Sequence, residues 1–313
     1  MPRLSDGWEA RLAILKIVSL LPSATEIVYL LGLGDNLVAN SHECDFPPEA
    51  ARKPRITRSL IHNGMDSRDI DRLVSEQLHT KGTLYELDLD LWQRVAPDLV
   101  LTQKLCDVCA ISYDNIARAV TLLNPQPEVL TLEPQLIEDV FTNILTIGAA
   151  TRTLDKAREV VQHLKARVHS VRSRAPKTNT KVLCLEWLDP PFCAGHWLPQ
   201  IVTYAGGVDG LGKLAEDSVR IEWETIARYD PEIVVVMCCG FGIPRTLEDI
   251  TKLAGNKVWR NLRAVKSNRV FITDGNHYFS RPGPRLVDSL EIMAGILHPE
   301  VFPEFAEKNF VRL

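Results

Sequence analysis

Residues 87–103 read LDLDLWQRVAPDLVLTQ, and residues 221–237 read IEWETIARYDPEIVVVM. When Pro97 is aligned with Pro231, acidic residues coincide in pairs: Asp88 with Glu222, Asp90 with Glu224 and Asp98 with Glu232. Each copy predicts a short amphipathic helix, a Pro-acid turn and an apolar strand. A second, weaker pair matches residues 26–32 with residues 200–206. Two similar α/β halves with their own cores predict two lobes with a cleft between them, and small ligands usually bind in such clefts.

Length and composition agree with two lobes. The 313 residues exceed what a single hydrophobic core usually serves, so two domains are expected. The composition, 45% hydrophobic and 24% charged, is ordinary for a globular protein. The net charge of −4 provides no basic surface for nucleic acid, and no apolar run reaches the length of a membrane span.

The order of apolar runs predicts the architecture. Strand-like runs alternate with helix-like segments in both halves, which favours parallel sheets. Residues 136–174 instead contain no strand signal, and residues 154–173 predict one continuous amphipathic helix of about 30 Å. We therefore expect an N-terminal α/β lobe over residues 1–152, a bridging helix over 153–175 and a C-terminal α/β lobe over 176–313.

The N-terminal segment and the cysteines predict a location. Met1–Leu15 carries Asp6 and Glu9, and the apolar run Ile14–Leu21 predicts the first core strand rather than a cleaved signal. The seven cysteines are an odd number without regular spacing, which favours reduced thiols. Both observations predict a cytoplasmic protein.

Several motifs together resemble one family. The motifs are IVSLLPSATEIVYLLGLG, SHECDFP, PDLVLTQ, AGHW followed by YAGG, and GPRLVDSLEI. In this order they resemble the helical-backbone (class III) solute-binding proteins of ABC importers, specifically the cobalamin-binding group. The resemblance covers residues 16 to 299. It implies two Rossmann-like lobes with parallel sheets, joined by one long rigid helix, with the ligand held between the lobes.

The family resemblance also bears on ligand and partner. Family members bind cobalamin, haem, ferric siderophores or metal ions, so the resemblance implies binding more securely than it implies one ligand. Importer binding proteins carry an export signal or a lipid anchor. The sequence shows neither, which leaves delivery to an ABC permease open.

Candidate ligand contacts follow the predicted strands, because ligands meet parallel sheets at the carboxyl ends of the strands. The predicted set is Ser23, His42, Glu43, Cys44, Cys106, Cys109, Trp187, His196, Trp197, Phe241, His277 and Tyr278. A corrin ring is broad, partly apolar and edged with amides, so aromatic faces and a few hydrogen-bond donors suit it. The same rings are equally compatible with lobe cores.

The cysteines leave three interpretations open. Cys106 and Cys109 form a C-x-x-C pattern without the second pair that structural zinc requires. Together with Cys44 and His196 they are candidate ligands for zinc or another transition metal, since thiolate and imidazole suit such metals better than calcium. They are also compatible with buried packing residues or with a redox pair.

Three functions remain at this stage. The first is a binding protein for a cobalamin-like corrinoid or a related metal chelate, with no catalysis. The second is a cytoplasmic metal-dependent or thiol-dependent enzyme on the same scaffold, and the third is a metal-ion sensor or carrier. The sequence contains neither a P-loop nor a G-x-S-x-G motif. Binding is therefore favoured over catalysis, and no catalytic residue is assigned.

Overall fold

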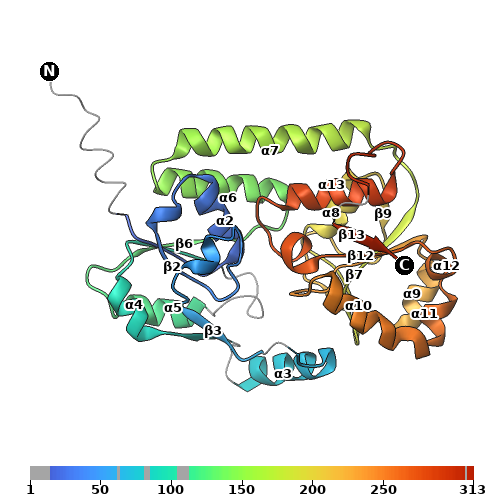
Figure 1. The fold of residues 1–313 in the computed structure, drawn as a ribbon, viewed down its shortest axis with the longest axis horizontal. Coiled ribbons are helices and arrows are strands. Elements are labelled where there is room, and N and C mark those ends of the chain that lie inside the picture. The colour runs from blue at the N-terminus through green and yellow to red at the C-terminus, as the bar shows by residue number, and fades with distance from the viewer. Residues whose placement is uncertain (1–14, 62–63, 81–84, 104–112, 307–308) are drawn as a thin grey trace. The chain divides into compact units, whose positions relative to one another are not determined.

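The computed structural model describes residues 15–61, 64–80, 85–103, 113–306 and 309–313. The chain divides into two compact units (Figure 1). Unit 1 comprises Met1–Pro134 and Asp139–Val161, and unit 2 comprises Gln135–Glu138 and Gln162–Leu313. The three-part division expected from the sequence stays a prediction.

Unit 1 contains a four-stranded parallel sheet with the order β2-β1-β5-β6. Its strands are β1 (Ile17–Ser19), β2 (Leu37–Asn40), β5 (Leu99–Thr102) and β6 (Glu128–Thr131). A separate antiparallel pair joins β3 (Thr57–Ser59) to β4 (Tyr85–Leu87). Because β1 lies between β2 and β5, the chain leaves β1 where the strand order reverses, and such points commonly bind ligands.

Helices cover both faces of this sheet. The helices of unit 1 are α2 (Pro22–Leu30), α3 (Ser67–Thr80), α4 (Leu89–Val95), α5 (Tyr113–Val120) and α6 (Ile137–Ala150), of which α3 lies away from this sheet (Figure 1). In Figure 1, α4 and α5 lie on one side of the sheet, and α2 and α6 lie on the other. Trp92 of α4 is fully buried, and its indole N–H donates to the Ala119 carbonyl of α5 at 3.0 Å. This bond fixes the two helices to one another over the sheet core.

Helix α7 (Leu154–Arg174) is one unbroken helix of 21 residues, in the place the apolar stripe predicted. Residues of that stripe are buried: Ala157, Val161, Leu164, Val168 and Val171. The division between the units falls inside α7, after Val161. The second half of α7 belongs to unit 2. There Arg167 forms ion pairs with Asp288 and Glu291 of α13 (Leu286–Leu297).

Unit 2 contains a mixed sheet of seven strands with the order β10-β8-β7-β11-β12-β13, and β9 also pairs with β7. The strands are β7 (Lys181–Leu188), β8 (Pro191–Cys193), β9 (Val208–Asp209), β10 (Val219–Arg220), β11 (Ile233–Val236), β12 (Val270–Thr273) and β13 (Phe310–Arg312). The pairs β9-β7, β7-β11 and β11-β12 are parallel, as expected. Strands β8, β10 and β13 pair antiparallel with their neighbours, which the sequence did not predict.

The helices of unit 2 are α8 (Leu198–Tyr204), α9 (Trp223–Tyr229), α10 (Ile243–Lys252), α11 (Lys257–Asn261), α12 (Arg263–Lys266) and α13 (Leu286–Leu297). One core joins α9 and α11 to the sheet, with Ile226 and Trp259 packed on Leu185 and Val234. The predicted α/β class with parallel strands is thus confirmed. None of the described helices is both long and apolar enough to cross a membrane.

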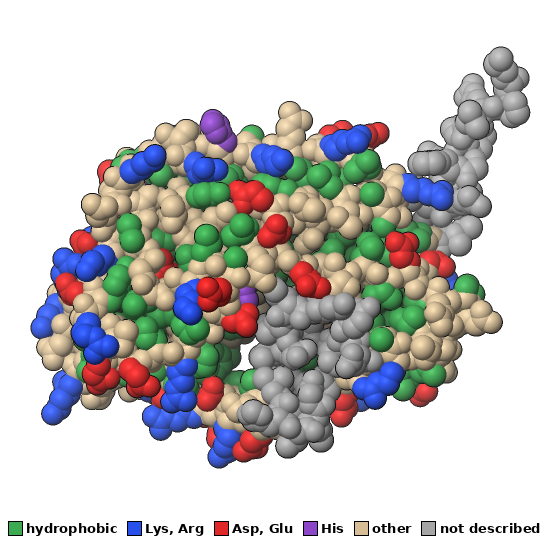
Figure 2. All heavy atoms as spheres, turned by 180° about the vertical axis from the view of Figure 1, so that it is seen from behind, with side chains coloured by type: hydrophobic (Ala, Val, Ile, Leu, Met, Phe, Trp, Pro, Cys, Tyr) green, Lys and Arg blue, Asp and Glu red, His purple; other side chains and the backbone are tan. Residues whose placement is uncertain are grey.

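The surface charge is mixed. Lys and Arg side chains alternate with Asp and Glu over the face drawn in Figure 2, without a single-sign field. This agrees with the small net charge of −4.

The sequence repeat has a structural counterpart. Helices α4 and α9 both end in a left-handed residue, Ala96 with φ 42° and Asp230 with φ 54°. In both copies the acidic residue after the proline bonds the chain ahead of the first strand of the unit. The Asp98 amide donates to the Lys16 carbonyl, and the Glu232 amide donates to the Lys181 carbonyl, each at 2.8 Å. The same Pro-acid turn therefore connects helix to strand in both units.

The weaker sequence repeat, residues 26–32 and 200–206, corresponds to the same type of helix end in both units. Gly32 after α2 and Gly206 after α8 both have positive φ, 78° and 92°. The following amides bond back identically: Leu33 to Val28 and Gly207 to Val202, each at 2.9 Å. Glycine accommodates this left-handed helix cap at little cost. The surroundings differ, because a Cβ would meet nothing within 4 Å at Gly32 but would overlap the Pro176 carbonyl at Gly206.

Because of this difference, we expect a Gly→Ala substitution to destabilise the protein less at Gly32 than at Gly206. Gly32→Ala adds only the strain of a left-handed alanine, about 1–2 kcal/mol. We expect Gly206→Ala to lower the melting temperature at least twice as far, because the backbone at Pro176 must also move. Differential scanning calorimetry of the two variants checks this. Equal shifts would mean that the surroundings of Gly206 relax freely.

Candidate functional site

His42 is held in the loop after β2 by three contacts. Its Nδ1 lies 2.7 Å from Thr57 Oγ1, its backbone N–H donates to the same oxygen at 3.1 Å, and its ring lies 5.1 Å from the Tyr85 ring. Its Nε2 lies 3.2 Å from a carboxylate oxygen of Glu43. The imidazole is thus oriented, and the neighbouring Glu43 is partly exposed.

Cys44 is fully buried, and its sulfur accepts the hydroxyl of Thr25 at 3.1 Å. The Arg55 guanidinium donates to the carbonyls of Ser41 and Cys44 and thereby clamps the loop between them. Ser23 lies in the first turn of α2 and is 5% exposed. The structure therefore places these two predicted contacts in the interior of unit 1.

Cys106 and Cys109 lie outside the described residues, so their predicted role stays a prediction. Across the described part of the chain, no group of three or more His, Cys, Asp or Glu side chains is arranged to hold a metal ion. The described residues therefore contain no cluster of side chains that could form a transition-metal site.

In unit 2 backbone hydrogen bonds tie the end of β7, the loop after β11 and the turn after β12 together. The Cys239 amide donates to the Glu186 carbonyl at 2.9 Å, and the Asn276 amide donates to the Phe241 carbonyl at 3.1 Å. A Cβ at Gly275 would overlap the Cys238 carbonyl, so only glycine permits this approach. The carboxyl edge of the sheet is thus one connected surface.

Trp187 and Phe241 form an aromatic pair on this edge. Their ring centroids lie 5.1 Å apart at an interplanar angle of 39°, and the Arg245 guanidinium lies 4.5 Å over the Phe241 ring. Both rings are half-buried. The Trp187 indole N–H is shielded from water and has no hydrogen-bond partner among the described residues. A buried donor without a partner is costly, and a ligand acceptor would remove that cost.

His196 has a left-handed backbone with φ 51°, which is unusual for a residue other than glycine, Asn or Asp. Two backbone bonds impose this conformation: His196 N–H to the Glu216 carbonyl at 2.7 Å, and Ala215 N–H to the His196 carbonyl at 2.9 Å. Gly195 permits the close approach, since a Cβ there would overlap the Glu216 carbonyl. Such strain frequently marks a functional position.

The His196 ring is oriented on both sides. Nδ1 lies 3.2 Å from the Gln135 side-chain oxygen, Nε2 lies 3.8 Å from Asp217, and the ring stacks on Trp197 at 5.3 Å. Burial lowers the pKa of His196 below its ordinary value, and the Asp217 carboxylate opposes that shift. The imidazole is therefore neutral at neutral pH.

The remaining predicted rings divide between interior and surface. Trp197 is 5% exposed, and its indole N–H donates to the Phe279 carbonyl at 2.9 Å, as a core residue does. His277 lies in the turn after β12, where Asp274 accepts its backbone N–H and contacts its Nδ1, each at 2.8 Å. Tyr278 is half-buried, with the Arg285 guanidinium 5.6 Å from its ring centroid.

Sequence reasoning did not select Glu186, which lies beside Trp187 on β7. Burial raises the pKa of its carboxyl to about 7, and a hydrogen bond from Ser218 opposes the shift. A carboxyl that titrates near neutrality at a strand end is typical of functional sites. The detectable signal was the acidic residue inside the otherwise apolar stretch VLCLEWL.

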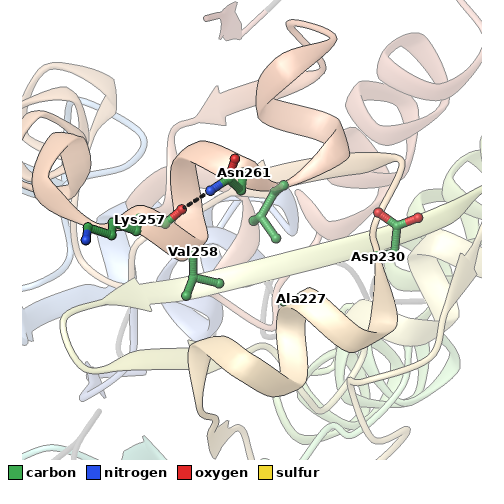
Figure 3. A pocket seen from close by; sticks show the side chains of 6 residues that line it. Ala227, Asp230, Lys257, Val258 and Asn261 are labelled. Carbon is green, nitrogen blue, oxygen red and sulfur yellow. Dashed lines mark hydrogen bonds between the residues drawn. The ribbon is translucent and has the colours of Figure 1, made fainter.

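Two surface hollows lie elsewhere, at the helices of the sequence repeat. One of about 440 Å³ is lined by Asp88, Asp90, Gln93 and Arg94 at α4. The other, of about 290 Å³, lies between α9 and α11 (Figure 3), where Asn261 donates to the Lys257 carbonyl at 3.0 Å. Neither is lined by a predicted ligand contact.

Comparison with known proteins gives one consistent result. A family model described as "Periplasmic binding protein" matches residues 17–276. An uncharacterized ABC transporter substrate-binding lipoprotein, YvrC of Bacillus subtilis, is 26% identical over 298 residues, covering 92% of this chain and 82% of the relative. The vitamin B12-binding protein of Vibrio cholerae is 21% identical over 284 residues, covering 88% and 86%.

The fold also matches solved structures. The periplasmic heme-binding protein RhuT from Roseiflexus sp. RS-1 superimposes with a TM-score of 0.67 at 18% identity, over 90% of this chain and 97% of that chain. At this identity the likeness establishes the fold alone. The resemblance read from the sequence motifs is confirmed.

The predicted cytoplasmic location is wrong, since the relatives are lipoprotein or periplasmic binding proteins of importers. The thiol argument behind it fails for a physical reason. Of the five free cysteines described, Cys44, Cys184, Cys193 and Cys238 are buried, and only Cys239 is partly exposed. Buried thiols stay unpaired through packing, so their reduction says nothing about the compartment.

The environment of His196 predicts a pH dependence. Because the folded-state pKa is lowered, the neutral ring contributes stability that is fully present above the unfolded value of 6.5 and declines as pH falls below it. We expect the His196 imidazole to titrate below 6.5 in NMR spectra, with its signal assigned by its loss in His196→Asn. Asparagine tolerates the left-handed backbone, so this variant keeps the fold. A titration at or above 6.5 would contradict the buried environment.

Proposed function

We propose that this chain, which belongs to the periplasmic binding protein family, binds a corrinoid or a related metal chelate outside the cytoplasm for delivery to an ABC permease. The observation that carries the proposal is the Trp187–Phe241 pair with its unpartnered indole N–H at the carboxyl edge of β7 and β11. An aromatic pair with a free donor suits a broad, partly apolar ring that carries acceptors at its edge.

The relatives support the ligand class. Those named vitamin B12-binding proteins align along nearly the whole chain, and a structural neighbour is named for heme. Both ligands are planar metal macrocycles, so the proposal covers a cobalamin-like corrinoid first and haem as the alternative outcome.

The enzyme alternative depended on the thiols and a metal. Its main candidates, Cys106 and Cys109, lie outside the described residues, and Cys44 is buried and bonded to Thr25. No described observation favours catalysis over binding, so binding is the function proposed.

Cyanocobalamin tests the proposal directly. We expect the purified protein to bind it in isothermal titration calorimetry and Trp187→Phe to weaken binding about tenfold, because one buried hydrogen bond contributes about 1–2 kcal/mol. Trp223→Phe is the matched control: Trp223 packs on Trp259 in the α9–α11 core, and its loss should leave affinity unchanged. No cyanocobalamin binding together with tight haem binding would shift the proposal to haem. Binding of neither would end it.

Matched acidic residues support a partner that contacts both units. Asp90 on α4 and Glu224 on α9 occupy equivalent positions of the repeat, are both exposed, and form no ion pair with any described residue. By contrast, the nearby Asp88 is used as a helix cap, accepting the Leu91 N–H at 2.9 Å. Unpaired surface charges raise association rates with a basic partner. We propose that this pair meets basic residues of the permease.

Charge reversal separates docking from ligand binding. The test replaces the natural gene with one that encodes the double variant Asp90→Lys, Glu224→Lys. We expect cells that carry this variant to take up labelled cyanocobalamin at least about tenfold more slowly. The purified double variant should keep the affinity of the wild type. Glu159→Lys on α7, also an exposed site, serves as the control. Unchanged uptake would exclude these two positions from docking.

A further inference from the structure

Glu186 is an acidic side chain set among buried apolar neighbours. Cys184 and Leu185 precede it on β7 and are 1% and 0% exposed, and Leu188 beyond it is 2% exposed. Glu186 and Trp187 are the partly accessible residues of this stretch. Both precede the hairpin to β8, at the edge where ligands meet parallel strands. The carboxyl is therefore shielded from bulk water, and its residue directly precedes Trp187 of the aromatic pair on β7.

The hydrogen bonds around Glu186 leave it with acceptor capacity. The Gly195 N–H donates to Ser218 Oγ at 3.0 Å, so the Ser218 hydroxyl proton is available to the Glu186 carboxyl, to which Ser218 is hydrogen-bonded. A carboxylate accepts up to about four hydrogen bonds, and Ser218 supplies one. Within the described part of the chain, no Lys, Arg or His forms an ion pair with Glu186.

Among the described residues, the groups that interact with Glu186 are neutral or acidic. They are the thiols of Cys184 on β7 and Cys193 on β8, and Asp209 on β9 acts on the same two thiols. When the Glu186 carboxyl is ionised, no cation among the described residues therefore compensates its charge. Burial raises its pKa to about 7, so it is mostly charged at pH 8 and mostly protonated at pH 6.

We infer that Glu186 is a specificity-determining residue that favours a macrocycle edged with amides and disfavours one edged with carboxylates. The inference rests on the proposed function. Amide N–H groups at the ligand edge donate to the free lone pairs of the carboxyl. A ligand carboxylate at the same place meets a like charge in a shielded environment, where repulsion is strong and no cation of the described residues relieves it. Corrinoids carry amides on their periphery, whereas haem carries propionates.

Two corrinoids with the same ring test the inference without changing the ring shape. Cobinamide carries peripheral amides, and cobyrinic acid carries carboxylates at those positions. We would titrate wild type, Glu186→Gln and the control Glu300→Gln with both, each in the aquacyano form, at pH 8 and pH 6 by calorimetry. Glu300 is an exposed residue of unit 2 that follows α13, with a side chain 69% exposed.

Wild type should bind cobinamide at least tenfold more tightly than cobyrinic acid at pH 8, with a smaller preference at pH 6, where Glu186 is protonated and the ligand carboxylates stay ionised. Glu186→Gln should bind cobyrinic acid about tenfold better than wild type at pH 8, bind cobinamide within about threefold of wild type, and lose the pH dependence. Glu300→Gln should behave as wild type.

Each result is decisive. Equal affinity of wild type for the two corrinoids, or a preference that is unchanged in Glu186→Gln, would overturn the inference while leaving the proposed function intact. Failure of wild type to bind either corrinoid would overturn both. If Glu186→Gln does not fold, the pH series of wild type decides alone, because a preference that stays constant from pH 8 to pH 6 excludes a titrating carboxyl at the ligand edge.

Discussion

Parallel strands end at one edge of their sheet, and this constraint determines where polar chemistry can gather in each unit. In unit 2 the constraint is strengthened by backbone bonds that join Glu186 of β7 to the loop after β11, and that loop to the turn after β12. This edge of the sheet carries Trp187, Phe241 and Glu186. Strands β8 and β10 continue the sheet beyond β7. The site chemistry thus depends on main-chain geometry more than on any one side chain.

The sequence predicted what periodicity and turn chemistry encode. The Pro-acid turns at Pro97 and Pro231 were recognised because a proline followed by an acid interrupts an apolar pattern in both halves, and the structure shows matching left-handed helix ends there. Helix α7 was recognised from its apolar stripe. Strands β8 and β10 were not predicted because each is only two or three residues long. That is too short for an alternation of apolar and polar residues to be recognised.

Side-chain environments were predicted less well, for a related reason. Trp187 lies near the end of β7 and Trp197 follows β8, yet the Trp197 indole N–H donates to the Phe279 carbonyl while the Trp187 indole N–H has no described partner. Cys44 was predicted as a ligand contact, but it is fully buried, with its sulfur bonded by Thr25 and its carbonyl by Arg55. Such distinctions arise from contacts between segments far apart in the chain, which local pattern does not encode.

Gly275 shows how tightly the carboxyl edge constrains change. Its backbone lies so close to the Cys238 carbonyl that no side chain fits. Variation that retunes ligand preference must therefore occur in the side chains around this contact, with the contact itself kept. An engineer seeking a new ligand has the positions of Trp187, Glu186 and Phe241 to vary, while residue 275 is closed to mutation, and libraries that spare it will waste fewer members on unfolded protein.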